Sequence, residues 1–153
     1  MNTSIEWNRV SGFNSGGEII KKDLDLMSSG HMGDEEICEL LTEFVRDGGI
    51  SSAAIPALKY LTGDLAELSP ESRLNCLYTA CLILGHAQKD QTAFNSLEES
   101  SPESLCKKTL GRFLQAASNH ELNSDWKVSI AAVVLLLNKD ESSYKRLVEN
   151  GHL

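Results

Sequence analysis

Two stretches of this chain, Leu74 to Leu84 and Trp126 to Leu137, are apolar on nearly every face that a helix would present. A helix of this kind is stable only when other elements surround it. The rest of the 153-residue chain offers such elements, because apolar residues recur at helical spacing, as in Ile37, Leu40, Leu41, Phe44 and Val45. We therefore predict an all-α fold of stacked antiparallel helices with Leu74 to Leu84 at its centre.

The signals for helix ends support the same fold class. Ser69-Pro70-Glu71 and Ser101-Pro102-Glu103 each place a serine at the N-cap and a proline at the first helical position. The serine oxygen accepts a hydrogen bond from a free backbone N–H of the first turn. Proline lacks an N–H, but an N–H at the first helical position would have no partner within the helix. Gly48-Gly49 is expected to end the helix that starts near Asp34. Aromatic residues make up only 6% of the chain, which favours helices over a sheet.

The first 32 residues differ from the rest in their glycines and scattered polar residues. We interpret residues 1–32 as an extended peptide arm with a Ser/Gly spacer, and residues 33–153 as a helical repeat-like domain. Gly30-His31-Met32 is a pattern that cloning junctions often leave, so the arm is either a fused partner peptide or a native flexible segment. Its candidate anchors for a hydrophobic groove are Trp7, Val10, Phe13, Ile19, Ile20 and Leu24.

An internal repeat is expected in the second half of the chain. A set of four positions recurs 50 residues later, since Lys89, Asp90, Phe94 and Leu97 match Lys139, Asp140, Tyr144 and Leu147. An apolar stretch precedes each set, so the predicted unit is a long buried helix, a polar turn and a short helix. A repeat of this kind buries its apolar face only by stacking on its neighbours.

Residues 35–153 resemble the armadillo and HEAT-like repeat families. Residues 131–151 look like the third helix of an armadillo repeat followed by a small-residue corner, and residues 45–58 resemble that corner and the next helices. The resemblance implies a right-handed helical array whose groove holds a peptide. Two features depart from the family: the offset of 50 is longer than an armadillo repeat, and Glu98-Glu99 follows the first copy without a glycine corner. An irregular helical bundle would satisfy the same residues.

The net charge of −8 makes nucleic acid and anionic membranes poor partners, because both carry negative charge. The longest apolar run, Ile130 to Leu137, is too short to span a bilayer. Two acidic clusters could instead form a rim around a basic ligand, and otherwise they are solvated helix ends. The rim candidates are Glu35, Glu36, Glu39, Glu98, Glu99 and Glu103.

The sequence carries none of the short motifs for nucleotide binding, hydrolysis or metal binding that we sought. Its four cysteines lack zinc-binding spacing and fall within apolar helical patterns, which favours reduced thiols and an intracellular location. Cys106 lies close to a helix start, where the dipole could lower its thiol pKa, although a structural thiol is the preferred interpretation. We expect no catalytic site, cofactor or metal.

These observations favour a non-catalytic protein–protein interaction module, either a scaffold or an adaptor, that binds an extended peptide in a helical groove. Residues 1–27 could themselves be the bound peptide. The alternative is a small acidic neutralising partner, such as an immunity protein or a secretion chaperone, that covers a basic protein. The partner is thus a protein or peptide with apolar anchors or a basic face. The chain is expected to be a monomer or an arm-swapped dimer.

Overall fold

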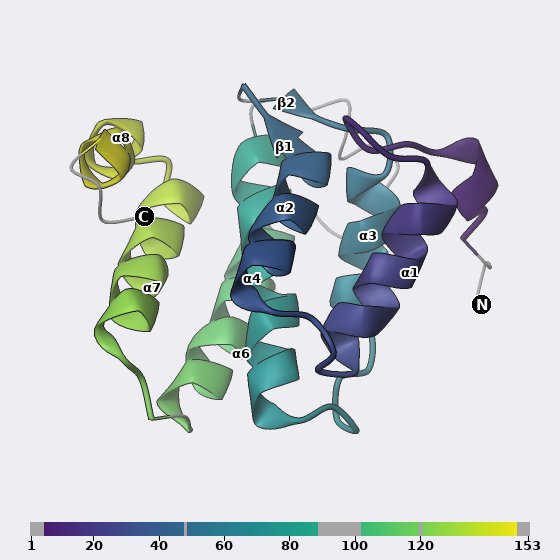
Figure 1. Ribbon diagram of the computed structural model, residues 1–153. Helices are drawn as coiled ribbons and strands as arrows, with labels where there is room; N and C mark the ends of the chain where they lie inside the picture. The colour runs from purple at the N-terminus through teal and green to yellow at the C-terminus, as the bar shows by residue number, and fades with distance from the viewer. Residues whose placement is uncertain (1–4, 48, 89–101, 120, 150–153) are drawn as a thin grey trace.

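The computed structural model describes residues 5–47, 49–88, 102–119 and 121–149 (Figure 1). Most of these residues are helical, which confirms the predicted all-α class, and the sheet among them has two short strands. The elements in order are η1 (Trp7–Arg9), α1 (Gly17–Ser28), α2 (Asp34–Phe44), β1 (Val45–Arg46), β2 (Gly49–Ile50), α3 (Ala54–Leu61), α4 (Pro70–Ala87), α6 (Pro102–Ser118), α7 (Ser124–Leu137) and α8 (Glu141–Glu149).

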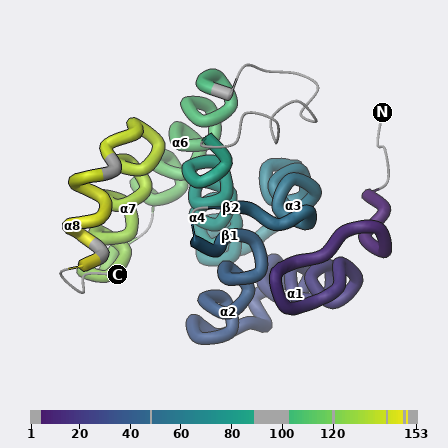
Figure 2. The backbone as a smooth tube through the Cα atoms, turned by 90° about the horizontal axis from the view of Figure 1, so that it is seen from above, coloured from purple at the N-terminus to yellow at the C-terminus, as the bar shows by residue number. Residues whose placement is uncertain are grey.

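Helix α4 is the centre of the molecule, as its all-round apolar pattern predicts. It packs against α1, α3, α6 and α7, and both views place it among the other helices (Figures 1 and 2). Its start has the expected chemistry, since Pro70 opens the helix and the Ser72 N–H donates to Ser69 Oγ at 3.2 Å. Near its other end, Gly85 allows close approach of α7, because a Cβ at this position would lie 2.4 Å from Leu136 Cγ.

Helix α1 corrects the prediction that residues 1–32 are extended throughout. Gly17–Ser28 forms an α-helix, and the side chains of Ile20, Leu24 and Met27 are at most 1% exposed in the core. Their spacing of four and then three residues gives the segment one apolar helical face, which packs on α4. Burial of this apolar face therefore stabilises the helix, although the glycines around the segment disfavour one. The proposed boundary at residue 32 stays a prediction.

The segment before α1 follows an irregular path held by hydrogen bonds to the rest of the fold. The Glu43 carboxylate at the end of α2 accepts the backbone N–H groups of Asn14 at 2.8 Å and Ser15 at 3.0 Å. Ser11 and Ser52 exchange two further hydrogen bonds, since each accepts from the other. These contacts attach residues 11–15 to the body of the molecule.

Helix α2 ends before the predicted stop at Gly48-Gly49, and Val45, which was expected on its buried face, begins a strand. The helix ends at Phe44, and the chain reverses in a hairpin that pairs Val45 with Ile50 and Arg46 with Gly49. Asp47 takes a left-handed conformation there, with φ of 51°. The first copy of the predicted repeat, residues 89–97, lies outside the described residues. The second copy falls on the turn between α7 and α8, where Lys139 is also left-handed, and on α8 itself.

Candidate functional site

The six predicted anchors do not enter a common groove. Ile20 and Leu24 lie in the core, and Trp7 and Val10 pack against it while partly buried. The other two face solvent more openly: Phe13 is 37% exposed beneath the Arg46 guanidinium, and Ile19 is 56% exposed. Figure 2 shows α1 beside α2 and α3, on the side of the molecule opposite α7 and α8.

The acidic rim candidates that the structure describes lie on two helices. Glu35, Glu36 and Glu39 are exposed on α2, whereas Glu103 is exposed at the start of α6. The Glu36 carboxylate accepts a hydrogen bond from the Gly33 N–H at 2.7 Å at the start of its helix. The remaining candidates, Glu98 and Glu99, lie outside the described residues.

Helix α4 has one stripe of side chains that its neighbours leave half-exposed. From Leu74 to Ala87 every residue is buried except Asn75, Tyr78, Leu82 and His86. These four positions are separated by three, four and four residues, so they share one face of the helix. The packing of α1, α3, α6 and α7 around α4 therefore leaves one strip of the central helix open.

This strip forms the floor of a groove that residues of α2, α7 and α8 also line. Figure 2 shows α2 on one side of α4, and α7 and α8 on another. The wide end has a volume of about 450 Å³. Its lining comes from three helices and the N-cap of α7, and consists of Asp34, Ile37, Cys38, Leu41, Asn75, Tyr78, Asn123, Asp125, Trp126 and Ser129. The lining is mixed, with apolar side chains among amides, a hydroxyl and two carboxylates.

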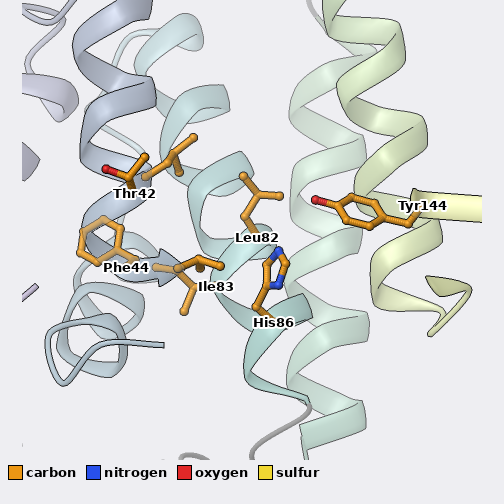
Figure 3. A pocket seen from close by; sticks show the side chains of 8 residues that line it. Thr42, Phe44, Leu82, Ile83, His86 and Tyr144 are labelled. Carbon is orange, nitrogen blue, oxygen red and sulfur yellow. The ribbon is translucent and has the colours of Figure 1, made fainter. Parts of the chain in front are cut away.

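A second, smaller cavity lies next to the wide one, since Leu41 lines both; we call the two together the groove and this cavity its narrow end. Its volume is about 150 Å³, and the other lining residues are Thr42, Phe44, Val45, Leu82, Ile83, His86 and Tyr144. Figure 3 shows Tyr144 of α8 directed across this space toward Leu82 and His86 of α4. The rings of Tyr144 and His86 meet edge to face with centroids 6.2 Å apart. The aromatic residue of the second predicted repeat copy thus closes one side of the groove.

Two aromatic rings form a corner at the wide end. The ring centroids of Tyr78 and Trp126 are 5.5 Å apart, and the ring planes are nearly perpendicular at 82°. The fully buried Phe113 contacts both rings from α6, with centroid distances of 6.0 Å and 6.4 Å. Burial raises the pKa of Tyr78, and a hydrogen bond with the Ser129 side chain opposes that shift. The rings are therefore held from behind, and both line the groove.

Sequence reasoning missed this groove. Asn75, Tyr78 and His86 could have identified the floor from sequence, because these polar or amphipathic residues share one face of an otherwise apolar helix. The walls carry no comparable signal. Asp34 and Trp126 are far apart in sequence, and only the packing of α2 and α7 brings them to one cavity.

The thiols differ sharply in access. Cys38 is exposed in the groove, whereas Cys76, Cys81 and Cys106 are buried. Burial raises the pKa of Cys76 to about 11 and that of Cys81 to about 12. Burial also raises the pKa of Cys106, so a lowered value at this helix start is wrong: desolvation outweighs the hydrogen bond from Gln88 and the charge of Lys139.

Comparisons with known proteins give no relative from which a site could be transferred: no family model, curated protein or solved structure matches the chain. Within the described residues, no group of three or more histidine, cysteine or acidic side chains is placed to hold a metal ion. None of the helices described is both long and apolar enough to cross a membrane.

Proposed function

We propose that this protein is an interaction module that binds an extended segment of a partner protein in the groove along α4. The observation that carries the proposal is the half-exposed stripe of Asn75, Tyr78, Leu82 and His86 on an otherwise buried helix. Concave surfaces with apolar walls and a few polar groups are typical of binding sites.

The dimensions of the groove suit a short peptide. Its floor runs from Asn75 to His86, a rise of roughly 16 Å along a helix, which is the length of about five extended residues. Asn75 and Asn123 are suited to a peptide backbone, since an amide side chain can both donate and accept hydrogen bonds. Ile37, Leu41 and Leu82 offer apolar surface to alternate side chains. An armadillo-like array is the architecture that we propose for these stacked helices, because such arrays present grooves of this kind.

A selection from a random twelve-residue peptide library displayed on phage tests the proposal on the full chain. Synthetic copies of the selected peptides should bind the wild-type chain, and Leu82→Arg should weaken them at least about tenfold by filling the groove floor. Leu114→Arg is the matched control, because Leu114 is a partly exposed leucine on α6 that does not line the groove. Circular dichroism would verify that both variants keep their helical content.

The selection separates three outcomes. Peptides that lose binding with Leu82→Arg and keep it with Leu114→Arg support the groove as the site. Peptides that bind both variants equally well place the site elsewhere and contradict the proposal. A selection that yields no specific peptide contradicts it as well.

A further inference from the structure

The charged side chains at the wide end of the groove all carry one sign. Asp34 enters from α2 and Asp125 from α7, and the ten residues that line this end include neither lysine nor arginine. Both aspartates are exposed, so their charge reaches the open groove. The two walls thus present negative charge to the space above α4 from opposite sides.

The floor and one wall between these carboxylates are aromatic. Tyr78 and Trp126 both line this end, and their ring planes are nearly perpendicular at 82°. The face of an aromatic ring attracts cations through its quadrupole, and tryptophan does so most strongly. Buried Phe113 holds both rings in place from the core side. Carboxylates and aromatic rings are the two kinds of group that recognise an organic cation, and both line this cavity.

We propose that this corner binds an arginine side chain of the partner segment; the inference rests on the proposed function and names the residue that the groove selects. A guanidinium is planar, so it can lie against the Tyr78 or Trp126 ring while its edge donates to Asp34 or Asp125. A lysine ammonium has the charge without the plane and gains less from the same walls. The segment would run from this arginine toward apolar side chains at the narrow end.

The test uses the full chain labelled with ¹⁵N and follows the indole N–H signals of its two tryptophans by NMR. Trp7→Phe assigns the signal of Trp126. The probe is N-acetyl-arginine amide, and its matched control is N-acetyl-citrulline amide, which has nearly the same shape without the charge. N-acetyl-lysine amide separates the guanidinium from a general cation.

The arginine probe should shift the Trp126 signal in a saturable way and bind about tenfold more tightly than citrulline, with lysine between them. Asp34→Asn combined with Asp125→Asn should lower the affinity for the arginine probe to that of the citrulline probe. Glu103→Gln with Glu121→Gln removes the same number of charges at exposed positions that do not line the groove, and it should leave the preference unchanged.

Equal affinities for the arginine and citrulline probes would overturn the inference, as would a Trp126 signal that does not shift. A preference for arginine over citrulline that persists in the double aspartate variant would also overturn it. Lysine binding as tightly as arginine would overturn the assignment to a guanidinium. These outcomes differ from those that contradict the proposed function. If the selected peptides need Leu82 but show no preference for arginine, the groove is still the binding site, and only the proposed arginine site is wrong.

Discussion

At the scale of single residues, Glu43 shows how one side chain fixes the start of the chain. Its carboxylate is 8% exposed and accepts hydrogen bonds from the backbone of Asn14 and Ser15 and from the Ser15 hydroxyl. Burial raises the pKa of Glu43, but these hydrogen bonds outweigh burial and leave it below the ordinary value of 4.5. The charged form is therefore favoured in the folded state.

Replacing Glu43 with glutamine should lower the free energy of unfolding at pH 7 by about 1–3 kcal/mol, because two backbone N–H groups lose an ionised acceptor. Since the folded pKa is lowered, this contribution is present above pH 4.5 and is lost as the pH falls through the folded value. Urea unfolding of both proteins at several pH values measures it. A deficit that stays constant from pH 7 to pH 3 would show that the charge is not responsible.

At the scale of elements, the contact between α4 and α7 depends on Gly85. A Cβ at this position would overlap Leu136 Cγ and Cδ2, so the Leu136 side chain or α7 itself would have to shift. Gly111 on α6 offers a control in the same kind of element, because a Cβ there meets nothing within 4 Å. Comparing alanine substitutions at the two glycines therefore separates the effect of helix propensity on stability from the effect of packing.

We expect Gly85→Ala to destabilise the protein by about 1–3 kcal/mol, since the overlap with Leu136 outweighs the better helix propensity of alanine. Gly111→Ala should stabilise it by up to about 1 kcal/mol, because only propensity changes there. Thermal unfolding followed by circular dichroism compares both variants with the wild type. Stabilisation by both substitutions would mean that α7 does not lie this close to α4.

The elements also show what sequence can predict here. The start of α4 was predictable from Ser69 and Pro70, because capping depends on adjacent residues alone. Helix α1 was missed, although Ile20, Leu24 and Met27 have helical spacing, since the glycines around them outweighed a short pattern.

The groove could not be predicted from sequence, because Asp34, Tyr78 and Trp126 meet only when three helices have packed. The predicted acidic rim stays a prediction, because Glu98 and Glu99 lie outside the described residues and charge clusters in sequence do not specify which helix faces coincide.

At the scale of the whole molecule, the structure places residues 17–28 within the same core as the later helices. Leu24 is fully buried with residues of α2, α3 and α4, and Asp25 accepts a hydrogen bond from the Tyr60 hydroxyl of α3 at 2.6 Å. A segment joined in this way should unfold together with the rest of the chain. A detachable arm would unfold separately.

Leu24→Ala should therefore lower the free energy of unfolding of the whole chain by about 2–5 kcal/mol in a single transition, because it leaves a cavity in the shared core. Ile19→Ala on the same helix should cost less than about 1 kcal/mol, since Ile19 is 56% exposed. In a Trp7→Phe background, where Trp126 is the remaining tryptophan, fluorescence and far-UV circular dichroism should report the same midpoint. An early α1 transition that leaves the Trp126 signal unchanged would instead support an arm docked on an independent domain.

The groove is the central claim for the molecule as a whole, and Cys38 provides the most direct test of it. Cys38 is the exposed thiol among four cysteines and lines the wide end, whereas Cys76 and Cys81 are fully buried and Cys106 is 6% exposed. The decisive measurement is the rate at which a thiol reagent labels Cys38 in the full chain, with and without a saturating peptide from the library selection. A peptide that lies along α4 should slow this labelling at least about tenfold by covering the thiol, and Leu82→Arg should abolish the protection at the same peptide concentration. Unchanged labelling of Cys38 under saturating peptide would contradict a binding site in the groove.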